Sequence, residues 1–151
     1  VEEDKLINWL KHRQRICLLD VGCGSGAGSV AFLAKVLLLK EHKKLPNDIN
    51  ILCIGVDPSH RAIGLYSQMM KTLKLSLSKL INLDFKIVND GFPSATLSIS
   101  QYLREELDLS KLPCLSNVLV MQLNVISPFS QTYRNRQNNY DELRALDIDI
   151  D

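Results

Sequence analysis

Two apolar runs that each end in an aspartate constrain the fold of this chain more than any other feature. The first run lies in LLDVGCGSG and ends on Asp20, and the second lies in ILCIGVDPS and ends on Asp57. Both are short continuous apolar runs, which is typical of buried strands. Gly22, Gly24 and Gly26 follow the first run at alternate positions. The sequence therefore predicts two buried strands, with a tight turn after the first.

Helical patterns alternate with the apolar runs along the chain. We expect helices over the opening residues around 6–10 and over about 29–40, 59–77 and 96–107. We expect strands over 16–21, 51–56, 85–88 and 117–126. Because parallel strands need crossover connections, this alternation predicts an α/β fold with a mostly parallel sheet.

The composition is that of one globular domain. Of 151 residues, 46% are apolar and 23% are charged, close to the average for soluble proteins. The net charge of +1 offers no overall field for attracting nucleic acid or an anionic membrane. The longest apolar stretch, 30–39, is shorter than the roughly 20 residues that span a bilayer. The acidic N-terminus is unlike a secretory signal, so we expect a cytoplasmic protein without a membrane partner.

Cysteine and histidine residues show no spacing typical of a metal site or a hydrolytic triad. The four cysteines are Cys17, Cys23, Cys53 and Cys114, and the three histidines are His12, His42 and His60. We interpret the cysteines as reduced thiols and expect no metal. No catalytic residue is identified from the sequence.

Acidic side chains mark the ends of three predicted strands. The carboxyl ends of parallel strands meet at one edge of a sheet, which is where open α/β sheets bind ligands. Asp20 there favours a positively charged group over a pyrophosphate. Asp57 can accept hydrogen bonds from both hydroxyls of a ribose, and Asp90 from an adenine amine. This combination suits a nucleoside with a cationic tail, such as S-adenosylmethionine.

These motifs resemble those of the class I S-adenosylmethionine-dependent methyltransferases. The family's first motif, acid-x-Gly-x-Gly-x-Gly, is matched position by position by Asp20, Gly22, Gly24 and Gly26. The resemblance covers residues from about 16 to 126. It implies that the glycine turn contacts the methionyl part of the cofactor, Asp57 the ribose and Asp90 the adenine. It also implies an enzyme that transfers a methyl group to an acceptor.

The resemblance defines a cofactor site and a fold. The predicted cofactor-binding residues are Asp20, Gly22, Cys23, Gly24, Gly26, Asp57, Pro58, Asp90, Gly91 and Asn124. The implied fold is an open, doubly wound, mostly parallel Rossmann-like sheet with strand order 3-2-1-4. The family's sheet usually has seven strands, whereas this sequence supplies about four. We therefore expect residues 1–151 to be a single domain and a fragment, whose remaining strands come from a longer chain or a partner.

Two other functions fit parts of this pattern. A non-catalytic, methyltransferase-like binding or assembly module would explain the missing half of the sheet. An NAD(P)-binding oxidoreductase domain fits less well, because its Gly-x-Gly-x-x-Gly fingerprint would need a glycine where Ala27 stands. The sequence does not indicate whether the methyl acceptor is a small molecule, an RNA or a protein. We expect it near residues 124–129, after the fourth strand.

Overall fold

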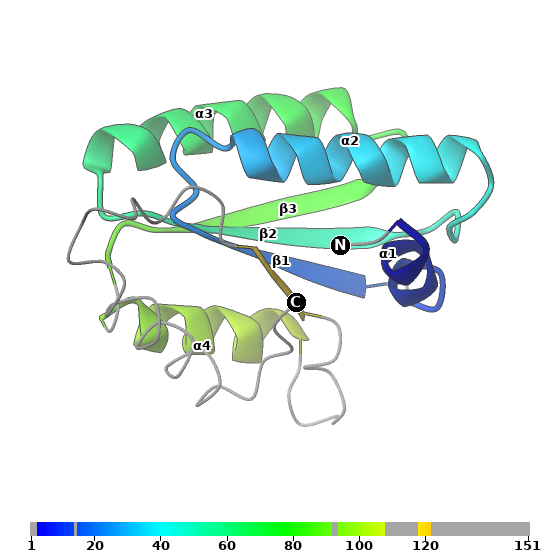
Figure 1. Cartoon of the computed structure of the whole chain (residues 1–151). Coiled ribbons are helices and arrows are strands. Elements are labelled where there is room, and N and C mark those ends of the chain that lie inside the picture. The colour runs from blue at the N-terminus through cyan, green and yellow to red at the C-terminus, as the bar shows by residue number, and fades with distance from the viewer. Residues whose placement is uncertain (1–2, 14, 92–93, 108–117, 122–151) are drawn as a thin grey trace.

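A computed structural model gives the fold and describes residues 3–13, 15–91, 94–107 and 118–121. Its helices are α1 (Glu3–Leu10), α2 (Ala27–Glu41), α3 (His60–Ser76) and α4 (Ala95–Leu107). Its strands are β1 (Arg15–Val21), β2 (Asn50–Val56), β3 (Asn82–Val88) and β4 (Val118–Met121). The predicted α/β class with a parallel sheet is confirmed (Figure 1). Among these helices, none has the length and apolar character needed to cross a bilayer.

The sheet has its first strand in an inner position. β1 pairs in parallel with β2 on one side and with β4 on the other, and β2 pairs with β3. The order across the sheet is β3-β2-β1-β4. From β1 the chain moves in one direction to β2 and β3, and then crosses back to the other side of β1. The direction thus reverses at β1, and ligands of open α/β sheets bind at such a reversal, outside the carboxyl ends of the strands.

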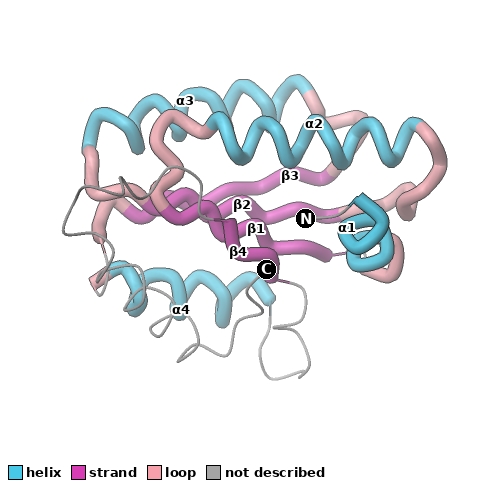
Figure 2. The backbone as a smooth tube through the Cα atoms, viewed as in Figure 1, coloured by secondary structure: helices cyan, strands magenta, loops and turns pink. Residues whose placement is uncertain are grey.

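Helices cover both faces of the sheet (Figures 1 and 2). α2 and α3 lie side by side on one face, and α4 lies on the opposite face. In β1, Ile16 and Leu18 belong to the core under α2 and α3, whereas Cys17 and Leu19 belong to the core under α4. Successive side chains of a strand point to opposite faces. A strand buried on both faces therefore reads as a continuous apolar run, as β1 and β2 do.

The helices that lead away from the sheet begin in different ways. Ser59 caps α3, because its side chain accepts a hydrogen bond from the backbone N–H of Ala62 at 3.2 Å. α2 has no side-chain cap and begins after Gly26, whose φ of 103° is left-handed. The first turn of α2 therefore follows directly from the conformation of the glycine turn.

Candidate functional site

The glycine turn joins β1 to α2, and its three glycines adopt left-handed backbone conformations. The φ angles of Gly22, Gly24 and Gly26 are 69°, 54° and 103°. Residues with a Cβ rarely adopt such angles. A Cβ on Gly26 would also lie 2.2 Å from Cε of Met69 and 3.0 Å from the Tyr66 ring. A Cβ on Gly24 would meet no atom within 4 Å, so the space over this residue is open to a ligand.

Hydrogen bonds fix the start of the turn to the end of β2. The backbone N–H groups of Gly22 and Cys23 both donate to the carbonyl of Val56, at 2.7 and 3.1 Å. The Cys23 side chain is buried. Burial, with the nearby charges of Asp20 and Asp57, raises the pKa of its thiol to about 12. Cys23 is therefore a neutral thiol near pH 7 and is not an activated nucleophile.

Asp57 connects the glycine turn to the start of α3. Its Oδ2 accepts a hydrogen bond from the N–H of Gly24 at 2.9 Å, and its Oδ1 accepts one from the N–H of Ser59 at 2.8 Å. The side chain is half-buried. An ionised carboxylate has about four lone-pair sites, so each oxygen of Asp57 retains capacity for a further donor. The structure thus brings two of the predicted site residues, Gly24 and Asp57, into direct contact.

The ends of β2 and β3 are linked by Asn89. Its Nδ2 donates to the carbonyls of Asp57 and Pro58, at 3.1 and 3.2 Å. Its Oδ1 lies 3.0 Å from Nδ1 of His60, which donates when that nitrogen carries the proton. The N–H of Asp57 also donates to the carbonyl of Val88 at 3.1 Å. These bonds hold the backbone around Asp57 from both sides.

Asp90 and Gly91 form the neighbouring turn, after β3. The N–H of Gly91 donates to Oδ1 of Asp90 at 2.8 Å, and the carbonyl of Gly91 accepts from Ala95 at 2.9 Å. A Cβ on Gly91 would lie 3.9 Å from Cβ of Pro58, so the two predicted site residues are neighbours. Asp90 is exposed, and its carboxylate is accessible to a donor on a ligand.

The sequence led us to expect Asp20 to face the ligand crevice at the ends of the strands. In the structure it instead lies buried below the glycine turn. Its side chain is only 2% exposed, and its Oδ2 accepts from Oγ of Ser29 at 2.6 Å. Oγ of Ser29 also lies 3.1 Å from the Tyr66 hydroxyl. Since the single hydroxyl proton of Ser29 goes to Asp20, Tyr66 must donate to Ser29. The result is a buried chain of hydrogen bonds from α3 through α2 to β1.

The buried position changes the proton affinity of Asp20. Burial raises the pKa of its carboxyl group, the hydrogen bonds from Ser29 lower it, and the charge of Asp57 raises it again. The net effect is a raised pKa. Asp20 and Asp57 are thus close enough to influence each other, and together they make this end of the sheet acidic.

Four residues support the site but are not among those that the sequence predicts for it: Ser29, Gly55, Tyr66 and Asn89. Tyr66 follows the apolar spacing of α3, which by itself indicates a core residue. A Cβ on Gly55 would lie 2.5 Å from Cε1 of Tyr66, so the ring packs directly on the backbone of β2. A glycine within an apolar strand is a signal of such a close approach, and a tyrosine in a core stripe signals a buried hydroxyl that needs a partner.

Other predicted features are not part of this cluster. Asn124 and the segment 124–129 lie outside the described residues. The described cysteines, Cys17, Cys23 and Cys53, are buried and form no disulfide bond. In the part of the chain that the structure describes, no group of three histidine, cysteine or acidic side chains is arranged to hold a metal ion.

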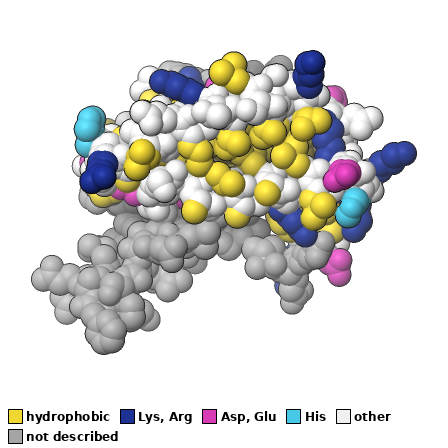
Figure 3. Space-filling model, turned by 90° about the horizontal axis from the view of Figure 1, so that it is seen from above, with side chains coloured by type: hydrophobic (Ala, Val, Ile, Leu, Met, Phe, Trp, Pro, Cys, Tyr) yellow, Lys and Arg dark blue, Asp and Glu magenta, His cyan; other side chains and the backbone are white. Residues whose placement is uncertain are grey.

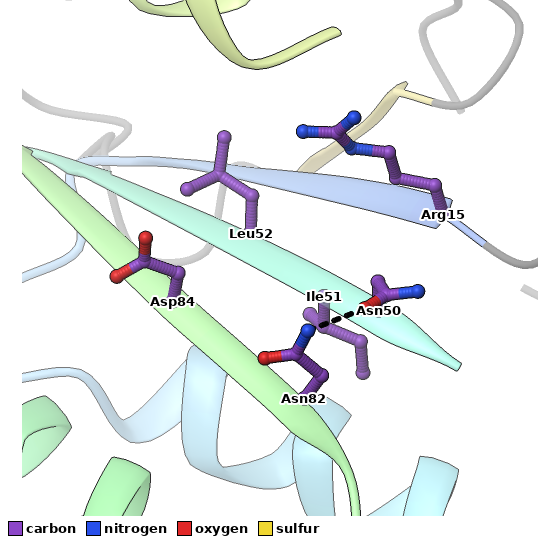
Figure 4. A pocket seen from close by; sticks show the side chains of 6 residues that line it. All are labelled: Arg15, Asn50, Ile51, Leu52, Asn82 and Asp84. Carbon is purple, nitrogen blue, oxygen red and sulfur yellow. Dashed lines mark hydrogen bonds between the residues drawn. The ribbon is translucent and has the colours of Figure 1, made fainter. Parts of the chain in front are cut away.

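A separate hollow lies at the opposite end of the sheet, where the strands begin (Figure 4). It is lined by Arg15, Asn50, Ile51, Leu52, Asn82 and Asp84. Nδ2 of Asn82 donates to Oδ1 of Asn50 at 2.6 Å across the two neighbouring strands. These residues belong to the first half of their strands, so the hollow is remote from the glycine turn.

No protein-family model matches the chain, and no curated protein matches it. The ligand must therefore be inferred from the site itself. The acidic side chains accessible at this site are those of Asp57 and Asp90, whose carboxylates accept hydrogen bonds but do not donate them when ionised. The open space over Gly24 lies beside Asp57. Such a site suits a ligand that carries several donors and a positive charge.

Proposed function

We propose that this chain binds S-adenosylmethionine and is a methyltransferase. The observation that carries the proposal is the position of Asp57. Its carboxylate is held by the backbone N–H groups of Gly24 and of Ser59, the residue that caps α3, and both oxygens retain lone pairs for a ligand. It lies at the carboxyl end of β2, beside the strand where the order of the sheet reverses.

The residues at the strand ends fit the donors of this cofactor. The two ribose hydroxyls match the free lone pairs of Asp57, and the adenine amine matches the exposed carboxylate of Asp90. The methionyl part would lie over Gly24, where a ligand can approach the backbone closely. Each donor of the cofactor would then have an acceptor or open space opposite it.

Electrostatics favour this cofactor over a dinucleotide. The charge of Asp57 acts on the carboxyl group of Asp20, so two acidic groups lie close to the glycine turn. A pyrophosphate placed there would be repelled by both. A sulfonium and an ammonium group would instead be attracted, and their positive charge would relieve the repulsion between the two aspartates.

The cofactor would supply a methyl group that its sulfonium already activates, so the protein mainly has to bind, orient and exclude water. The chain of hydrogen bonds through Tyr66, Ser29 and Asp20 would keep the turn rigid from below. Cys23, as a neutral thiol, would take no part in the transfer. The acceptor would approach from the solvent side of the strand ends, where residues 124–129 are predicted to contribute.

Transfer of a labelled methyl group tests the proposal. The chain is incubated with methyl-labelled S-adenosylmethionine and, separately, with total RNA, denatured protein and a small-molecule extract. We expect label in one acceptor fraction and none with the Asp57→Ala variant. Label in no fraction, from a chain that binds S-adenosylhomocysteine, would overturn the enzymatic part of the proposal and favour the non-catalytic binding module.

A further inference from the structure

α2 is apolar on the side that faces solvent as well as on the side that faces the sheet. Its buried side chains include Phe32, Leu33, Val36 and Leu39. Its exposed side chains include Ala27, Val30, Ala31, Ala34 and Leu38. Val30 and Leu38 are 38% and 44% exposed. A helix that is apolar on all sides is normally buried on all sides. The outer side of α2 is therefore suited to contact with another molecule.

α3 continues this apolar surface. A Cβ on Gly26, at the start of α2, would lie 2.2 Å from Cε of Met69, so this side of α3 faces α2. Leu65 precedes Met69 by one helical turn on the same side and is 49% exposed. We name six exposed apolar residues on this side of the two helices the α2–α3 strip: Ala27, Val30, Ala31, Ala34, Leu38 and Leu65. Figure 3 shows apolar side chains running along the middle of this layer.

Basic side chains border the α2–α3 strip. The two helices and the segments that lead from them to β2 and β3, residues 27–49 and 60–80, contain eight lysine or arginine residues and only two acidic ones. The layer is therefore strongly basic although the whole chain has a net charge of +1. One of the lysines, Lys74, is paired with Asp84 of β3 at 2.9 Å. Figure 3 shows lysine and arginine side chains around the apolar centre.

We propose that the α2–α3 strip binds an amphipathic helix of a partner protein, whose apolar stripe is bordered by aspartate and glutamate. The 15 residues of α2 make a strip about 22 Å long, which matches about four turns of a bound helix. The basic border selects an acidic partner. The same border repels a second copy docked through this face. The inference goes beyond cofactor binding and does not depend on it.

A pair of designed peptides tests the inference on the full chain. The probe is a fluorescein-labelled helical peptide of about 18 residues, with leucine at i, i+3, i+4 and i+7 spacing and glutamate on both borders. The control peptide has lysine at every glutamate position. Fluorescence anisotropy is measured at about 50 and about 300 mM salt. We expect the glutamate peptide to bind, more weakly at the higher salt, and the lysine peptide to bind at least about tenfold more weakly.

Variants of the chain locate the binding surface. Leu38→Glu and Leu65→Glu each place a charge on the strip at an exposed position, and we expect each to weaken binding at least about tenfold. Leu97→Glu is the matched control, because Leu97 is 81% exposed on α4, on the other side of the sheet. It should leave binding unchanged. Circular dichroism checks that each variant is folded.

Four results would overturn the inference. In the first, the glutamate peptide does not bind, or both peptides bind alike. In the second, Leu38→Glu and Leu65→Glu bind the peptide as the parent chain does. In the third, vesicles of phosphatidylserine and phosphatidylcholine bind the chain while the peptide does not, which would assign the strip to a membrane surface. In the fourth, sedimentation shows a dimer that Leu38→Glu dissociates, which would assign the strip to a second copy.

Discussion

Asp57 is the single residue on which ligand binding should depend most. Replacing Asp57 by Ala removes the acceptors proposed for the ribose and the acceptor of the Gly24 N–H. A hydrogen bond to a charged group contributes about 1.5–3 kcal/mol, so we expect affinity for S-adenosylhomocysteine to fall about 10- to 100-fold or more. Titration calorimetry measures this. Asp84→Ala, at the opposite end of the sheet, is the control and should bind as the parent chain does.

The hydroxyl of Tyr66 should contribute to stability through Ser29 and Asp20. Tyr66→Phe keeps the ring that packs on Gly55 but removes the donor to the buried Ser29. We expect the free energy of unfolding to fall by about 1–2 kcal/mol in urea. Tyr102→Phe removes a hydroxyl that makes only a long, 3.5 Å contact with the carbonyl of Ile87. We expect this variant to lose less of the free energy of unfolding. If both variants lost the same free energy of unfolding, the result would contradict the buried series of hydrogen bonds from Tyr66 through Ser29 to Asp20.

At the scale of elements, replacing glycine by alanine should have opposite effects on stability at two positions, one at the start of α2 and one within α3. Gly26→Ala places a Cβ on a left-handed residue at the start of α2, which costs about 1–2 kcal/mol. Gly64→Ala lies in α3, where a Cβ meets nothing within 4 Å, and should stabilise the chain by about 0.5–1 kcal/mol. Urea unfolding compares them, and loss of stability in both variants would contradict the assigned conformations.

The buried elements could be predicted from the sequence because their patterns are local. β1 and β2 were expected over 16–21 and 51–56, and the structure gives Arg15–Val21 and Asn50–Val56. β3 was expected to begin at Phe85, but it begins at Asn82. Its first residues include Asn82 and Asp84, whose side chains are exposed or half-exposed at the sheet edge. These polar residues interrupt the apolar run from which a strand is predicted, so the start of β3 was missed. They also protect the edge of the sheet from pairing with a strand of another molecule.

The candidate site could be predicted only in part. The contact of Asp57 with the glycine turn follows from strand ends that meet at one edge of a sheet. The position of Asp20 was not foreseen, although it follows from the alternation along β1. Asp20 lies two and four residues after Leu18 and Ile16, which face α2 and α3. Its link to Tyr66 joins residues far apart in the sequence, and no local pattern contains that information.

At the scale of the whole molecule, burial of Asp20 should make stability depend on pH. The pKa of its carboxyl group is raised in the folded chain, whereas in the unfolded chain it is about 3.9. Between these two values the folded chain holds a proton that the unfolded chain has lost. The contribution of Asp20 to the free energy of unfolding therefore falls as the pH rises from about 4 through the raised pKa.

Asp20→Asn isolates this contribution. The amide removes the titrating group but keeps an oxygen that can accept from Ser29. Urea unfolding of both proteins from about pH 4 to pH 8 gives the difference between their stabilities. We expect the parent chain to lose stability relative to the variant as the pH rises. A relative gain over this range would mean that the pKa of Asp20 is lowered on folding.

The most direct test of the account is a calorimetric titration of the purified chain with S-adenosylhomocysteine, alongside NADH. The proposal predicts one site per chain for S-adenosylhomocysteine with a micromolar dissociation constant, corresponding to about −8 kcal/mol, and no measurable heat with NADH. Binding of NADH instead, or of neither ligand, would contradict the assignment of the strand-end aspartates and the glycine turn to S-adenosylmethionine.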